Sequence, residues 1–172
     1  MSRNDDKVIR FSGLKPGKYE YRFELDDLYF EGCENEELRG GNVEITAEME
    51  RGERSLMFAF RIVGRVKTWC DRCGGDMEVP IEGEERLSVR FSDTETSDNE
   101  DEAVLPEGAT EIDLSQWLYE YVAVRVPMQH VHEEGGCDEE TVRLLTSDDE
   151  QARRRNEETD PRWEALKALK RD

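Results

Sequence analysis

The sequence predicts an α+β protein: an antiparallel β-sheet, arranged as a meander or a partly closed barrel, with one packed helix, a short C-terminal helix and long acidic loops. Apolar and polar residues alternate through most of the chain up to residue 91, which is the pattern of half-buried strands. The gaps between these stretches are short, and short gaps favour antiparallel pairing because parallel strands need long crossovers. Beyond residue 106 the apolar residues recur at helical spacing, which predicts the packed helix.

Four stretches of the chain have the alternating pattern of strands. They are KYEYRFELDD (18–27), NVEITAEME (42–50), LMFAFRIVGRVKTW (56–69) and RLSVRF (86–91). Glycine and acidic residues favour turns between them. The expected joints are ENEELRGG, ERGERS and IEGEE.

An acidic segment separates the strands from the first helix. DTETSDNEDE (93–102) has no apolar residue, so it buries too little surface to offset the entropy of ordering it. We therefore predict a mobile acidic loop over about 93–109. The helix that follows should close over one face of the sheet, with an apolar stripe formed by Leu114, Trp117, Leu118, Tyr121 and Val122.

The end of the chain is charged until a short apolar stripe appears. We predict one β-rich α+β domain over residues 1–147, followed by a charged linker and a short helix over 148–172. Isolated short helices are marginal in water, so this one should dock, either on the protein's own core or in a partner groove. The docking residues would be Trp163, Leu166 and Leu169.

Charge and apolar content limit the function classes. The chain has 24 Lys and Arg against 43 Asp and Glu, a formal charge of −19, which argues against a nucleic-acid binder that uses its whole surface. The N-terminal residues have no apolar leader and no long apolar run follows, so neither secretion nor membrane spanning is expected. We predict a cytoplasmic protein, in which cysteines are thiols or metal ligands rather than disulfides.

Cys70 and Cys73 form a C-x-x-C pair, which can supply two of the four ligands of a tetrahedral zinc ion. The other two would be Cys137 and one of the two histidines, His130 or His132; we favour His132. The cofactor would be one structural Zn²⁺. Inert thiols are the main alternative. A redox switch is less favoured, because this C-x-x-C lies between strands rather than at a helix N-terminus.

A cationic stripe is expected on the outward face of the strand before Cys70. Arg61, Arg65 and Lys67 alternate with core residues, and Arg72 lies between the cysteines. These four residues are the candidate nucleic-acid contacts; pairing with glutamates of neighbouring strands is the alternative role. The sequence has no phosphate-binding loop, nucleophile elbow or H-E-x-x-H motif, so we predict neither an enzyme nor a small-molecule substrate.

Four motifs in order resemble the YceD-type proteins, the large ribosomal RNA subunit accumulation family. They are CDRCGG after an apolar strand, an Ile-Asp-Leu helix start, VPMQHVHEEGGC and a closing DPRWEALKALK. The resemblance extends from about Tyr19 to the C-terminus. It implies a cytoplasmic ribosome biogenesis factor that is needed for large-subunit rRNA to accumulate. Together with the charge pattern, it predicts that the acidic surface binds basic ribosomal proteins, that the cationic stripe binds rRNA precursor, or both. The competing hypothesis is a zinc-binding or thiol-based regulator that acts off the ribosome.

The resemblance also bears on individual positions. The family's C-x-R-C matches Cys70, Arg72 and Cys73, and its second loop matches Pro127, Val131, His132 and Cys137. Some relatives have further cysteines in that second loop, as a fuller zinc motif would, and this chain does not. His132 would substitute for the missing thiolate.

Overall fold

The computed structural model describes residues 7–33, 38–94 and 101–147. They fall into two compact units. Unit 1 takes the chain up to Trp69 and Asp76–Gln129; unit 2 takes Cys70–Gly75 and the chain from His130 onward. The predicted linker and helix of residues 148–172, with the Trp163, Leu166 and Leu169 stripe, lie outside the described residues.

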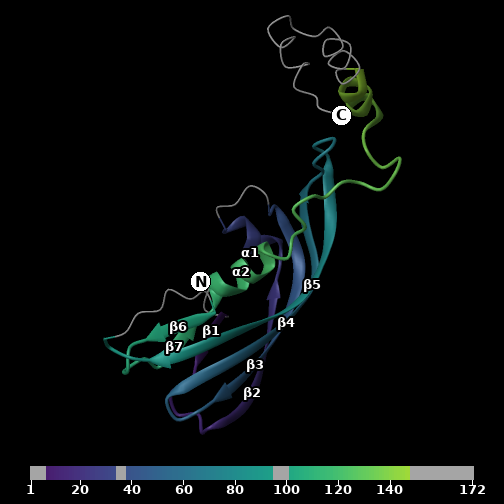
Figure 1. The fold of residues 1–172 in the computed structure, drawn as a ribbon. Coiled ribbons are helices and arrows are strands. Elements are labelled where there is room, and N and C mark those ends of the chain that lie inside the picture. Colours follow the sequence, from purple (N-terminus) through teal and green to yellow (C-terminus); the bar gives the residue numbers. More distant parts are fainter. Residues whose placement is uncertain (1–6, 34–37, 95–100, 148–172) are drawn as a thin grey trace, which may run out of the picture. The chain divides into compact units, whose positions relative to one another are not determined.

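Unit 1 is built on a five-stranded sheet of order β2-β3-β4-β5-β6 (Figure 1). The strands are β2 (Gly17–Leu25), β3 (Gly40–Arg51), β4 (Ser55–Trp69), β5 (Asp76–Phe91) and β6 (Glu102–Leu105). A second, two-stranded sheet pairs β1 (Val8–Arg10) with β7 (Glu111–Asp113). The predicted strands and the α+β class are confirmed. The sheet is open, so the partly closed barrel was the wrong alternative.

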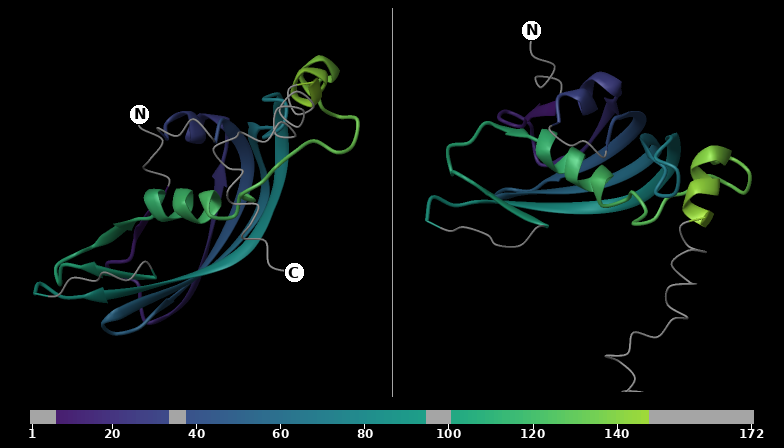
Figure 2. Two further views of the ribbon diagram at one scale, coloured as in Figure 1. Left: turned by 45° about the horizontal axis from the view of Figure 1, so that its top comes forward. Right: turned by 90° about the horizontal axis from the view of Figure 1, so that it is seen from above.

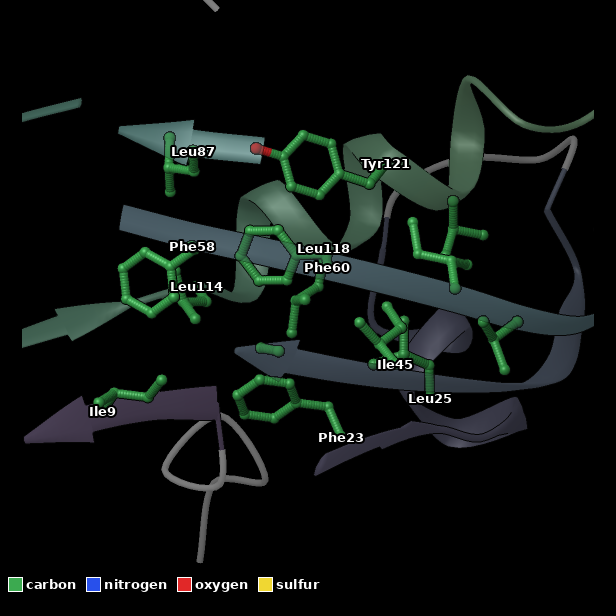
Figure 3. Close-up of a cluster of buried hydrophobic side chains, with 14 of the residues drawn as sticks. Ile9, Phe23, Leu25, Ile45, Phe58, Phe60, Leu87, Leu114, Leu118 and Tyr121 are labelled. Atoms are coloured by element: carbon green, nitrogen blue, oxygen red, sulfur yellow. The ribbon is translucent and has the colours of Figure 1, made fainter. Parts of the chain in front are cut away.

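Two helices lie in unit 1, α1 (Asp27–Glu31) and α2 (Ser115–Ala123). The predicted helix corresponds to α2, which lies along the concave side of the curved sheet (Figure 2). Its buried residues meet strand side chains, as when the Tyr121 ring packs 5.2 Å from that of Phe60 (Figure 3). Helix α1 was not predicted. It begins where the Asp26 carboxylate accepts a hydrogen bond from the Tyr29 N–H.

Three predictions were wrong. The range 93–109, assigned to a single loop, contains β6, because Ala103, Val104 and Leu105 give that part of the range apolar side chains that pair along β5. This pairing is parallel, so the sheet is mixed rather than an antiparallel meander.

The IEGEE joint, residues 81–85, is not a turn but part of β5. At Gly83 a Cβ would meet the Arg125 side chain, whose Nη2 donates to the Glu84 carbonyl oxygen; this glycine leaves room for that contact.

Strand β4 alternates strictly between the core and solvent. Leu56, Phe58, Phe60 and Ile62 are buried, while Met57, Ala59, Arg61 and Val63 are exposed. Gly64 falls on the inner side of this alternation, where β4 passes close to β3. A Cβ at Gly64 would lie 2.4 Å from the Asn42 carbonyl oxygen and 2.6 Å from the Val43 Cα. Backbone atoms cannot rotate away, so any larger residue at position 64 would force β3 and β4 apart locally.

Gly64→Ala is therefore expected to lower the unfolding free energy by about 1–3 kcal/mol, the usual cost of an overpacked interior site. Gly108→Ala is the matched control, since a Cβ at Gly108 has no atom within 4 Å. Urea denaturation of both variants followed by circular dichroism measures the difference. Equal midpoints for the two variants would contradict the close approach of β3 and β4.

Candidate metal centre

The chain between β4 and β5 folds into a tight knuckle that carries the C-x-x-C pair. The Cys70 N–H donates to the Gly75 carbonyl oxygen, and the Gly74 N–H donates to the Cys70 carbonyl oxygen, both at 2.8 Å. Gly74 has φ +66°, a left-handed conformation that glycine adopts without a side-chain clash. This turn lets both cysteine sulfurs point to one side, as in a zinc knuckle.

The second loop is anchored to the knuckle through Asp71. The Asp71 N–H donates to the His130 carbonyl oxygen at 2.9 Å, and the His130 N–H donates back to the Asp71 carboxylate at 2.6 Å. At the other end of the loop Asp138 caps a helical segment over residues 139–147, accepting from the Thr141 N–H at 2.8 Å. The Asp71–His130 bonds therefore hold the start of this loop beside the knuckle, and Asp138 fixes the start of the helical segment that follows it.

Four donor atoms converge between the knuckle and this loop: the sulfurs of Cys70, Cys73 and Cys137 and a ring nitrogen of His132, all within 4.8 Å of one another. The Cys70 and Cys137 sulfurs are 3.8 Å apart. His132 Nδ1 lies 3.4 Å from the Cys73 sulfur and 3.8 Å from that of Cys137. A zinc tetrahedron with ordinary bond lengths has donor–donor edges of about 3.5–3.8 Å. The Cys₃His set therefore fits Zn²⁺ in both chemistry and spacing.

The knuckle also lowers the pKa of two of the thiols, which favours the thiolate form that binds a cation. Burial raises the pKa of the Cys70 thiol, but backbone N–H groups of Cys73, His132 and Arg72 outweigh it and lower that pKa to about 6. The pKa of Cys73 is lowered chiefly by the N–H groups of Asp138 and Gly75. Burial raises the pKa of Cys137. Because the thiolate is the metal-binding form, Cys70 and Cys73 are the better prepared ligands.

The structure separates the two histidines that the sequence left as alternatives. His132 belongs to the cluster, whereas His130 Nε2 lies 3.7 Å from the Asp71 carboxylate and is not among the four donors. The fourth cysteine of the chain, Cys33, is in unit 1 and donates to the Tyr29 carbonyl oxygen. Sequence reasoning missed Asp71 and Asp138. Their positions immediately after Cys70 and Cys137 were the available signal.

The predicted cationic residues are distributed over both units. Arg61, Arg65 and Lys67 are exposed on the outward face of β4 in unit 1, while Arg72 is exposed on the knuckle in unit 2. Arg65 pairs with Glu78 at 3.3 Å and Lys67 with Asp27 at 2.8 Å. At least Arg65 therefore has the alternative role, pairing with a glutamate of the neighbouring strand. Nucleic-acid binding by these residues stays a prediction.

A family model described as "Large ribosomal RNA subunit accumulation protein YceD" matches residues 58–170, more than half of the chain. The chain belongs to the YceD family. The match begins inside β4, later than the Tyr19 expected from the motifs, and it includes all four Cys₃His residues. Comparisons with curated proteins and with solved structures found no match. Within the residues that the structure describes, this YceD family member has no helix long and apolar enough to cross a membrane.

Proposed function

We propose that this protein is an assembly factor of the large ribosomal subunit, which supports accumulation of large-subunit ribosomal RNA in the cytoplasm without catalysing a reaction. The observation that carries the proposal is the YceD family match, whose range spans the complete Cys₃His cluster. A structural Zn²⁺ held by Cys70, Cys73, His132 and Cys137 would supply a cross-link between the knuckle and the second loop.

The direct partner that we propose is a basic ribosomal protein. The formal charge of −19 attracts cationic proteins and repels phosphate groups. Two of the three cations of β4, Arg65 and Lys67, are each paired with a carboxylate, so they do little to reverse this field. A lysine- and arginine-rich protein therefore suits the charge better than an rRNA precursor, which is the alternative partner.

Sedimentation tests the proposed function. Tagged protein from growing cells, fractionated at low salt on a sucrose gradient, should migrate with immature large subunits, and the co-purified fractions should contain large-subunit rRNA and ribosomal proteins. The low salt preserves electrostatic contacts that screening weakens. Migration of all the protein at the top of the gradient would contradict the proposal and support a regulator that acts off the ribosome.

A charge-neutralising triple variant, Arg61→Gln with Arg65→Gln and Lys67→Gln, separates the two partner classes. Removing phosphate contacts weakens nucleic-acid binding steeply, so an rRNA-bound protein would leave the large-subunit fractions. With a basic protein partner the triple variant should stay in those fractions, because the substitutions remove cations and make the surface more acidic. Loss of the triple variant from these fractions would assign Arg61, Arg65 and Lys67 to rRNA.

A further inference from the structure

Strand β2 forms one edge of the five-stranded sheet, because among the described residues only β3 pairs with it. An edge strand presents backbone N–H and C=O groups that can pair with a strand of another chain. Within the described part of the chain, one further contact reaches the β2 backbone. It lies at the end of the strand, where Lys7 Nζ donates to the Glu24 carbonyl oxygen at 2.9 Å. The preceding length of β2, from Lys18 to Phe23, is therefore open to a partner strand.

Strand β2 lacks two of the features that usually protect an edge from pairing. Its nine residues include no proline, and all of them pair with β3 in one unbroken register, so the strand has no bulge. The opposite edge of the sheet, β6, is only four residues long. Strand β2 is thus the edge that is long and regular enough to accept another strand, and its charges decide which strand fits.

The exposed side of β2 carries charges that alternate in sign. Lys18, Glu20, Arg22 and Glu24 are all exposed. Arg22 contacts Glu20 of its own strand at 3.0 Å, yet their side chains remain 69% and 53% exposed. Two cations and two anions make this edge locally neutral, although the chain carries a formal charge of −19. The general repulsion between two acidic molecules is therefore weakest along this strand.

A second copy of β2 complements every one of these charges when it lies antiparallel with Tyr21 opposite Tyr21. Lys18 is then opposite Glu24 of the copy, and Glu20 is opposite Arg22. Two-fold symmetry repeats both pairs. A shift of two residues in either direction would instead place Glu20 or Arg22 opposite itself. A shift of one residue would exchange the core side of the strand with its exposed side. Only the register about Tyr21 satisfies all four charges.

The same pairing would relieve repulsion that exists inside the sheet. Glu20 and Glu24 lie directly opposite Glu48 and Glu44 of β3. Like charges in this position destabilise a sheet, and opposite charges stabilise it. In the register about Tyr21, the second copy brings an arginine beside Glu20 and a lysine beside Glu24. The copy thus supplies a cation to each of the two β2 glutamates that face a glutamate on β3.

We propose that β2 is the interface of a symmetric dimer, in which two copies of this chain join their sheets edge to edge and antiparallel about Tyr21. On the core side of the strand, Tyr21 meets Tyr21 of the copy and Tyr19 meets Phe23. Tyr19 and Tyr21 are only partly buried in the single chain, so these contacts add cover to both rings. The dimer is independent of the proposed role in ribosome assembly, since it uses only the register and charges of the sheet.

Sedimentation equilibrium of two charge-reversed variants, alone and mixed, tests the dimer. Wild-type protein should dimerise reversibly at concentrations below about 100 μM. Glu20→Arg and Arg22→Glu should each dimerise at least about tenfold more weakly, because symmetry converts two opposite-charge pairs into like-charge pairs. An equimolar mixture of the two variants should regain wild-type dimerisation, since each cation of one then faces an anion of the other. Neither variant keeps the Glu20–Arg22 contact of its own strand, so this recovery can arise only between chains.

The matched controls are Glu82→Arg and Arg86→Glu, which make the same charge changes on β5. Both residues are exposed, and β3 and β4 separate them from β2. Each control should dimerise within about twofold of the wild type. A wild-type protein that stays monomeric at about 100 μM would overturn the proposal. Unchanged dimerisation of the β2 variants, equal losses in the β5 controls, or a mixture no stronger than its separate components would each overturn it as well.

Discussion

Replacing His132 with alanine is expected to remove zinc from the protein, whereas replacing His130 is not. His132 Nδ1 is one of the four clustered donors, and His130 instead contacts Asp71. Outer contacts of metal sites are worth about 10–100-fold in affinity, so loss of a direct ligand should cost at least about 100-fold. Zinc content per chain, measured on purified protein by mass spectrometry, and competition with a chromogenic chelator report the difference.

The two histidine variants control for each other, because they remove the same ring two positions apart in one loop. Wild-type protein and His130→Ala should each carry one zinc ion per chain, and Cys70→Ser should behave as His132→Ala does. Retention of stoichiometric zinc by His132→Ala would contradict the Cys₃His assignment. A wild-type protein that takes up no zinc after purification with added metal would contradict it as well.

Zinc removal should loosen unit 2 and leave unit 1 folded. The buried apolar cluster of the described residues lies entirely in unit 1, while Leu144 and Leu145 of unit 2 are exposed. The described part of unit 2 thus has no apolar core, and we expect its fold to depend on the metal. Chelator should therefore speed amide hydrogen exchange in residues 130–147 but not in β3 and β4. Equal acceleration in both regions would show that the two units share one folding transition.

Phe60→Ala is expected to destabilise unit 1 by about 3–5 kcal/mol, the usual range for a large aromatic removed from a core. Phe60 is 1% exposed, and its ring lies 5.7 Å from that of Phe58 and 5.2 Å from that of Tyr121. The substitution leaves a cavity between β4 and α2 that neither element can close. Urea denaturation, monitored by circular dichroism, gives the change in unfolding free energy.

Met57→Ala is the control for this prediction, since Met57 lies on the same strand but is 47% exposed. Its cost should stay within about 0.5 kcal/mol, as for most surface substitutions. The contrast therefore tests which face of β4 is inside. Similar losses for Phe60→Ala and Met57→Ala would mean that the outward face is covered in the folded protein.

Local patterns predicted most of this sheet. The period of two in β4 assigns Phe58 and Phe60 to one face and Arg61 to the other, and the structure keeps that assignment. It could not show that β6 pairs in parallel with β5, because a four-residue strand has no pattern that encodes the direction of its neighbour. Nor could it show that Gly83 continues a strand, since the reason is Arg125, which lies 42 positions further along.

For the candidate metal centre, too, the sequence predicted one part and the structure supplied the other. By itself the sequence determined the chemistry, because a C-x-x-C pair and a nearby His and Cys are the donor types that zinc prefers. Only the tertiary structure decided between His130 and His132, because that choice depends on where the Asp71 backbone and carboxylate hold the second loop. Residue types are local properties of a chain, whereas the meeting of segments 59 positions apart depends on the hydrogen bonds between them.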